Sequence, residues 1–182
     1  MISSHIPALL LAAAMITGSA VTPAMAASSC NPFQDVAADA PYAAAVQYVY
    51  DAGITSGTGA HTYSPDNRIT FGEFALMLCR MYWPDENWTI DSATAQVAVD
   101  KLGNIMDPTG ARDMEVARPV AYRALLACSG VPIFSQELYG TNIEEEKELD
   151  DAVFTAMQLG LCDEDGMDWT LITRGEAAQI LY

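Results

Sequence analysis

The chain has 182 residues, of which 51% are hydrophobic, and its formal net charge is −16 from 24 acidic and 8 basic residues. This length and apolar content suffice for one domain with a hydrophobic core and exclude a disordered chain. Because so acidic a surface repels nucleic acids and anionic lipids, we expect no nucleic-acid partner. Any anionic ligand must therefore be held by a few well-placed arginines.

The first predicted element is an apolar segment, residues 6–16, followed by the small-residue motif Ala24-Met25-Ala26. This pattern is typical of a secretory signal peptide, residues 1–26, although no Lys or Arg precedes the apolar segment. A buried N-terminal helix is the alternative. No other apolar stretch of 18 residues follows. The sequence therefore predicts a secreted protein without an integral membrane segment after cleavage.

Six helices are predicted next, from apolar periodicity and from the glycine or proline residues that end helical patterns. Their approximate ranges are 42–52, 70–83, 92–102, 118–130, 147–159 and 173–182. The second has the clearest apolar stripe, with Phe74, Met77, Leu78 and Met81 on one face. No strand-like alternation longer than a few residues is present. The predicted fold class is therefore all-α with irregular loops.

The predicted helices form three helix–loop–helix repeats within one domain, residues 27–182. The repeats span about residues 30–83, 84–131 and 132–182, with an acidic insertion in the last. One such unit cannot bury its own apolar faces, so several copies must pack together.

Four cysteines follow the expected cleavage site, namely Cys30, Cys79, Cys128 and Cys162. An even number in an exported chain allows two disulfides, and buried free thiols are the alternative that the sequence leaves open. The sequence has no CxxC pair, so it does not favour a zinc site. The acidic run at 163–168 fails the register of a calcium loop, whose twelfth position would be Ile172. We therefore expect no metal and no cofactor.

Three sets of motifs resemble the S-layer homology (SLH) domain. The first repeat opens with Phe33-Gln34-Asp35-Val36, places Gly53-Ile54 after its first helix, and continues with Tyr63-Ser64-Pro65-Asp66-Asn67-Arg68-Ile69-Thr70-Phe71-Gly72-Glu73-Phe74. The third keeps Gly160-Leu161 and Ile172-Thr173-Arg174-Gly175-Glu176, whereas the second is degenerate around Val116-Ala117-Arg118-Pro119. The resemblance covers about residues 30–182. It implies three tandem repeats packed as a pseudo-threefold bundle.

The resemblance also implies a function. SLH domains typically attach exported proteins to the bacterial cell wall by binding secondary wall polysaccharide, often through sugars with a pyruvyl ketal, in grooves between repeats. We expect such a binding module at the cell wall or cell surface. We expect no enzyme, because His61 stands alone in the mature chain without a nucleophile or phosphate-loop motif. The alternative is a structural or adaptor protein of the envelope that has lost glycan affinity and binds another protein.

Arg174 matches the arginine of the family signature Thr-Arg-Ala-Glu, and Arg118 takes the equivalent place in the second repeat, where the first has Phe71. A cation in the first helical turn does not stabilise a helix, but guanidinium and backbone N–H groups converge there on a carboxylate. We therefore expect both arginines to bind glycan, and replacement of Arg174 to change stability little. An ion pair of Arg174 with Asp163 or Asp165 is the alternative.

Two further groups of residues are assigned roles. Thr70 with Glu73, and Thr173 with Glu176, have the spacing of capping boxes and are expected to be structural. Tyr63 and Trp169 lie in matching loops ahead of the second helices of their repeats. Each aromatic ring is a candidate for stacking on a sugar, and the alternative is a plug over the core.

Cleavage after Ala26 predicts that the exported protein begins at Ala27. N-terminal sequencing of protein recovered outside the cytoplasm tests this expectation. Retention of Met1 on a cytosolic protein would contradict the assignment of a signal peptide.

Overall fold

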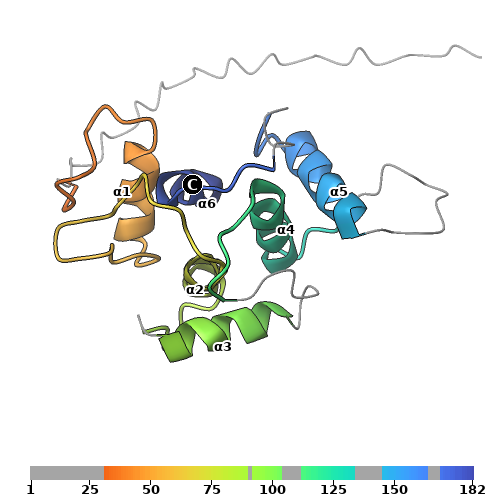
Figure 1. The fold of residues 1–182 in the computed structure, drawn as a ribbon, viewed down its shortest axis with the longest axis horizontal. Coiled ribbons are helices and arrows are strands. Elements are labelled where there is room, and N and C mark those ends of the chain that lie inside the picture. Colours follow the sequence, from red (N-terminus) through yellow and green to blue (C-terminus); the bar gives the residue numbers. More distant parts are fainter. Residues whose placement is uncertain (1–30, 90–91, 104–111, 134–144, 164–168) are drawn as a thin grey trace, which may run out of the picture. The chain divides into compact units, whose positions relative to one another are not determined.

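The computed structural model describes residues 31–89, 92–103, 112–133, 145–163 and 169–182. Within these ranges it contains the helices α1 (Ala43–Asp51), α2 (Phe71–Tyr82), α3 (Ser92–Gly103), α4 (Arg118–Cys128), α5 (Glu145–Gln158) and α6 (Arg174–Leu181) (Figure 1). The same ranges contain isolated β-bridges and no strand. The predicted all-α class is therefore confirmed for this part of the chain. The predicted signal peptide and Cys30 lie outside the described residues.

Local sequence signals explain where the helices begin and end. Gly53, Gly130 and Gly160 follow the ends of α1, α4 and α5 with φ between +66° and +73°, a backbone conformation that favours glycine. At the other end, α2 and α6 begin with complete capping boxes. The second helix of the predicted middle repeat, α4, has Ala117 at its N-cap and Pro119 in its first turn. Proline is accepted there because it has no backbone N–H to satisfy.

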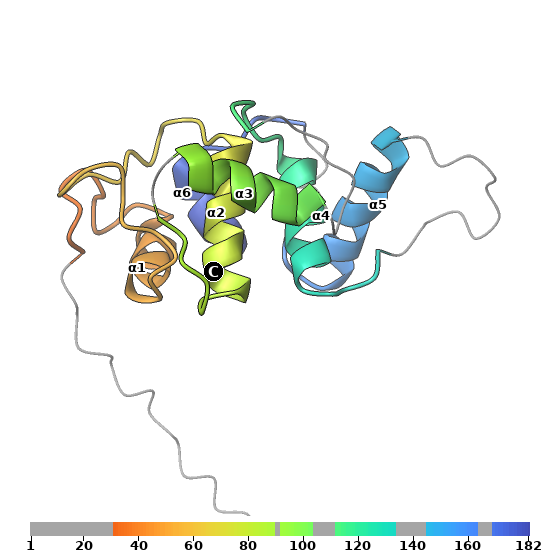
Figure 2. The same cartoon turned by 90° about the horizontal axis from the view of Figure 1, so that it is seen from below.

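The helices that pack together belong to neighbouring repeats. Helix α2 packs against α3, α4 packs against α5, and α1 packs against α6, while α4 also contacts both α2 and α6 (Figures 1 and 2). The second helix of each predicted repeat thus lies beside the first helix of the following one. The pair formed by α1 and α6 joins the first described helix to the last.

Three extended segments, each just ahead of a second helix, meet at the centre. The N–H of Ile69 donates to the carbonyl of Ile172 (3.3 Å), that of Ile172 to Val116 (2.8 Å), and that of Val116 to Ile69 (3.1 Å). These bonds close on themselves, and we call the three residues the central ring. Their side chains are at most 1% exposed. The three β-branched side chains are therefore buried at the place where their backbone N–H and carbonyl groups satisfy one another.

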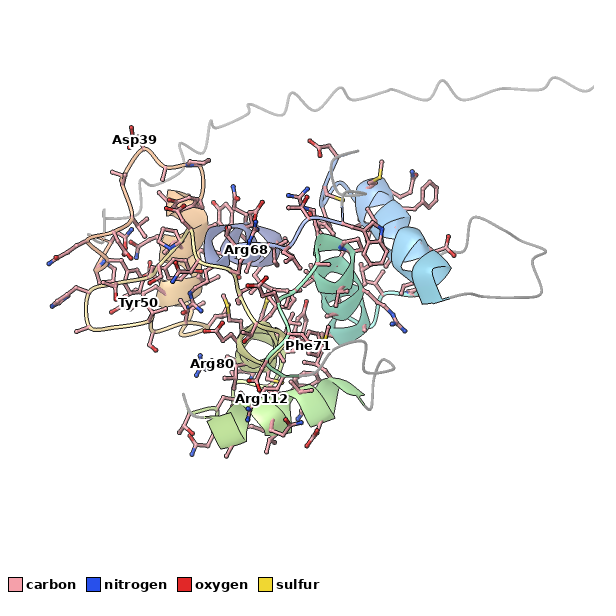
Figure 3. All side chains as sticks on the ribbon, in the orientation of Figure 1. Asp39, Tyr50, Arg68, Phe71, Arg80 and Arg112 are labelled. Atoms are coloured by element: carbon pink, nitrogen blue, oxygen red, sulfur yellow. The ribbon has the colours of Figure 1, made fainter. Side chains whose placement is uncertain are left out.

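The same segments also serve the helix starts. Backbone N–H groups at the start of a helix have no acceptor within it and need one from elsewhere. The N–H of Phe71 (Figure 3) donates to Met114, that of Arg118 to Thr170, and that of Arg174 to Asn67. Each second helix therefore begins at a position fixed by a different extended segment.

Three of the cysteines lie in the described part of the chain, and all three are free thiols. Burial raises the pKa of Cys79 to about 11, and burial together with the neighbouring Cys79 raises the pKa of Cys128 to about 12. Cys162 is partly exposed. None of the described helices has the length and apolar character needed to span a membrane.

The central ring yields a stability prediction. Replacing Ile172 with Ala should lower the free energy of unfolding by about 2–5 kcal/mol, the cost typical of truncating a buried isoleucine. Leu171, its neighbour in the chain, is 37% exposed and provides the matched control. Leu171→Ala should cost much less in urea unfolding followed by circular dichroism. Equal losses in the two variants would contradict the central role of Ile172.

Candidate functional site

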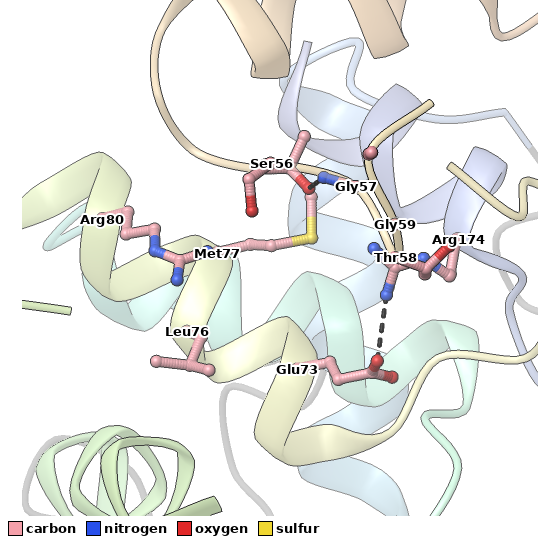
Figure 4. Close-up of a pocket in the computed structure, with 11 residues that line it drawn as sticks. Ser56, Gly57, Thr58, Gly59, Glu73, Leu76, Met77, Arg80 and Arg174 are labelled. Atoms are coloured by element: carbon pink, nitrogen blue, oxygen red, sulfur yellow. Dashed lines mark hydrogen bonds and ion pairs between the residues drawn. The ribbon is translucent and has the colours of Figure 1, made fainter. Parts of the chain in front are cut away.

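A groove of about 480 Å³ lies between the loop that follows α1 and one face of α2 (Figure 4). The loop contributes residues 55–60, and α6 contributes Arg174. The side chains from α2 are Glu73, Leu76, Met77 and Arg80. We call this hollow the Arg174 groove. Its walls thus come from the first and the last predicted repeats.

The loop wall is fixed by contacts near its two ends. Gly57 has a φ of +82°, and a Cβ there would lie 2.4 Å from both the ring of Phe33 and the carbonyl oxygen of Thr62. No other residue fits at that position without a shift. Further along, the carboxylate of Asp35 accepts hydrogen bonds from the N–H groups of Tyr63 (2.8 Å) and Ser64 (2.7 Å). The loop therefore has a defined path over the groove.

Arg174 is the buried cation of the groove, with 6% of its surface exposed. Its Nε donates to the carbonyl oxygen of Tyr63 (3.0 Å), and its Nη1 lies 3.0 Å from Oε1 of Glu73. The guanidinium also lies 5.2 Å from the centre of the Tyr63 ring. The ion-pair partner of Arg174 is therefore Glu73 and not Asp163, one of the two expected alternatives. The other alternative, Asp165, lies outside the described residues. Because replacement of Arg174 removes these contacts, we now expect it to cost stability rather than to change it little.

Both capping glutamates have a second role that their capping-box spacing does not indicate. Oε2 of Glu73 accepts from the N–H of Thr70 (3.0 Å), which leaves Oε1 for Arg174. The second capping box repeats this arrangement. Glu176 accepts from the N–H of Thr173 (2.7 Å) through Oε2 and from Nη2 of Arg118 (3.0 Å) through Oε1. Each carboxylate therefore caps its own helix and binds an arginine from another.

A third pair of the same kind would complete this pattern of arginine–glutamate pairs, but the two residues at its place have no charge. By the same order, the first residue of α2 would pair with the third residue of α4, and these are Phe71 and Val120. Both side chains pack in the main hydrophobic core. A buried charge without its partner destabilises a fold. A pair in which both residues are apolar therefore costs less stability than a pair that keeps only one charge.

A second groove, of about 500 Å³, is the counterpart of the first and contains Arg118 in the place of Arg174. Glu176, Gln179 and Ile180 of α6 replace three of the α2 side chains, and Asp163 also lines the groove. The charges differ between the grooves. The Arg174 groove has two arginines and one glutamate, whereas the Arg118 groove has one arginine and two carboxylates. The first is the more favourable place for an anion.

The two candidate aromatic residues have different surroundings. Tyr63 has no exposed surface, its hydroxyl donates to the carbonyl oxygen of Arg174 (2.9 Å), and burial raises its pKa to about 12. The assignment of Tyr63 as a sugar-stacking residue is therefore wrong, and the ring is a core plug. Trp169 is 47% exposed and is not among the residues that line either groove.

One segment of the chain matches a known protein family. Residues 32–75 match the family model described as the S-layer homology domain. No curated protein matches the chain. The matched segment includes the loop wall of the Arg174 groove and its carboxylate, Glu73. This segment of the chain therefore resembles the S-layer homology domain. Domains of this family generally anchor proteins to the bacterial cell wall.

The Arg174 contacts yield a second stability prediction. Arg174→Ala leaves the Tyr63 carbonyl and the Glu73 carboxylate without this donor, and should lower the free energy of unfolding by about 1.5–3 kcal/mol. The control is Arg112→Ala, because Arg112 forms an exposed pair with its sequence neighbour Asp113, and such pairs contribute little. Urea unfolding of both variants provides the measurement. An unchanged midpoint for Arg174→Ala would show that these contacts do not stabilise the fold.

Proposed function

We propose that the protein is an exported, non-enzymatic module that binds cell-wall polysaccharide through the Arg174 groove. The observation that supports this function is a pair of arginines, Arg174 and Arg80, that line one groove of a chain with a net charge of −16. An anionic sugar is repelled elsewhere by the acidic surface and attracted here. The cell-wall association of the family supplies the ligand class.

The chemistry of the groove suits a sugar that has a carboxylate, such as a pyruvyl ketal. Two of the five N–H groups of Arg174 are bonded to Tyr63 and Glu73, and within the described residues the other three have no protein acceptor. A guanidinium in a partly dehydrated groove forms strong, directional hydrogen bonds with a carboxylate. The hydroxyls of Thr55, Ser56 and Thr58, all lining residues, suit the hydroxyl groups of the same sugar.

The proposal includes three SLH repeats around an approximate threefold axis. The closed central ring, in which the three extended segments have equivalent hydrogen bonds, supports this arrangement. So do the two arginine–glutamate pairs, each of which joins the first residue of one second helix to the third residue of another. The middle repeat has lost its capping threonine and glutamate, and we infer that it retains the packing role.

The adaptor function remains a second candidate. The Arg118 groove favours it, because its carboxylates outnumber its arginine and oppose an anionic ligand. If the Arg174 groove also lacks glycan affinity, the domain is a packing module for another envelope protein. Sedimentation with purified wall polysaccharide separates the two functions. Cosedimentation supports the binding module, and its absence at high polysaccharide concentration supports the adaptor.

A paired substitution tests which groove is used. Arg174→Lys keeps the charge but removes the two-pronged geometry of the guanidinium, and should weaken polysaccharide binding about tenfold. Arg118→Lys makes the same change in the other groove and should leave the affinity within about twofold. Isothermal titration calorimetry gives both values, and thermal melts confirm that the variants are folded. Equal losses, or a loss confined to Arg118→Lys, would reject the Arg174 groove as the binding site.

A further inference from the structure

Another hollow, distinct from the Arg118 groove and of about 690 Å³, adjoins the Arg174 groove at Arg80. Thr55, Ser56 and Arg80 line both hollows, so the two are neighbours along the surface. Beyond these shared residues its walls include Tyr50 at the end of α1 (Figure 3) and Trp88 in the segment after α2. We call it the Trp88 hollow. A ligand longer than one sugar unit therefore has a path from Arg174 past Arg80 to two aromatic rings.

Arg80 is held firmly at the junction of the two hollows. Its Nε and Nη2 donate to the carbonyl oxygen of Trp88 (3.1 and 2.9 Å), and its Nη1 donates to that of Ile54 (3.1 Å). Three of its five N–H groups are thereby used to join α2 to the two neighbouring segments. Within the described residues the remaining two have no protein acceptor. They are available to the oxygen atoms of a linkage that crosses between the hollows.

The aromatic rings of the Trp88 hollow are also fixed. Tyr50 is 39% exposed and packs edge-to-face on Phe33, with ring centres 5.3 Å apart. Nε1 of Trp88 donates to the carbonyl oxygen of Trp83 (2.9 Å), and the ammonium of Lys101 lies 5.5 Å from the Trp88 ring centre. The polar atom of Trp88 is therefore already satisfied. Rings that are held in place before binding lose little conformational freedom on contact with a ligand.

The charges around the Trp88 hollow indicate what kind of unit it accepts. Asp51 and Arg80 are the charged residues among its lining and balance each other. An additional anionic group would meet Asp51, whereas a neutral sugar offers CH faces to the aromatic rings and hydroxyls to Thr55 and Ser56. The aromatic and hydroxyl lining thus matches an uncharged sugar.

We propose that the Trp88 hollow is a second subsite, which binds the neutral sugar linked to the carboxylated sugar in the Arg174 groove. The inference rests on the proposed function and adds to it the length and chemistry of the recognised glycan. The anionic unit occupies the Arg174 groove, the linkage passes Arg80, and the neutral unit stacks on Tyr50 and Trp88. The domain thus distinguishes a two-unit ligand from a single carboxylated sugar.

The test uses two synthetic probes and the full chain. One probe is a methyl hexoside with a pyruvyl ketal, and the other is the disaccharide in which a neutral hexose replaces the methyl group. The variants are Tyr50→Leu and Trp88→Leu, which keep apolar bulk but remove the flat ring. Tyr48→Leu is the matched control, because Tyr48 has the same 39% exposure on the same helix and contacts Tyr182 instead of the hollow.

We expect the unchanged protein to bind the disaccharide more tightly than the single sugar. Tyr50→Leu should reduce disaccharide affinity roughly fivefold, the worth of one aromatic contact, and leave single-sugar affinity unchanged. Trp88→Leu should act in the same way, and Tyr48→Leu should have no effect. Thermal melts identify any variant that is not folded, and the remaining one of the pair carries the test.

The possible failures are distinguishable. If the unchanged protein binds both probes equally, or if Tyr48→Leu and Tyr50→Leu reduce affinity alike, the second subsite is rejected while the proposed function stands. If the unchanged protein binds neither probe nor purified wall polysaccharide, both proposals are rejected together. Loss of affinity for the single sugar in Tyr50→Leu also rejects the subsite, because the hollow would then act on the first unit.

Discussion

The closed set of backbone hydrogen bonds between Ile69, Val116 and Ile172 is the constraint on which the other features depend. Each segment is both donor and acceptor, so none can be satisfied at the centre unless all three are present. Their meeting fixes where α2, α4 and α6 begin. Because an arginine at the first position of one helix then lies beside a glutamate at the third position of another, the ion pairs and the Arg174 groove follow from the same backbone arrangement.

Local features of this fold were predictable because they depend on neighbours in the chain. Apolar periodicity and terminal glycines located the described helices to within a few residues, and the Thr-x-x-Glu spacing located both capping boxes. The partner of Arg174 was not predictable, because the capping role of Glu73 already explained its place in the sequence. Nothing local indicated that its second carboxylate oxygen binds Arg174. Tyr63 was misassigned for a similar reason, since the acceptor of its buried hydroxyl is the distant carbonyl of Arg174.

The start of α4 lacks a capping box, yet its backbone is held in the same way as the starts of α2 and α6. Ala117 has no side-chain oxygen to cap α4, yet Pro119 lacks a backbone N–H and the N–H of Arg118 donates to Thr170. Fewer N–H groups therefore require a cap than at the other two helix starts. The capping residues are absent from this segment, whereas its β-branched Val116 still completes the central ring.

The packing of α1 against α6 has a consequence for the order of events during synthesis. A ribosome releases α1 and the loop 55–60 long before α6, and until then α1 lacks its main helical neighbour and Glu73 lacks Arg174. This region therefore cannot complete its native packing until α6 has emerged.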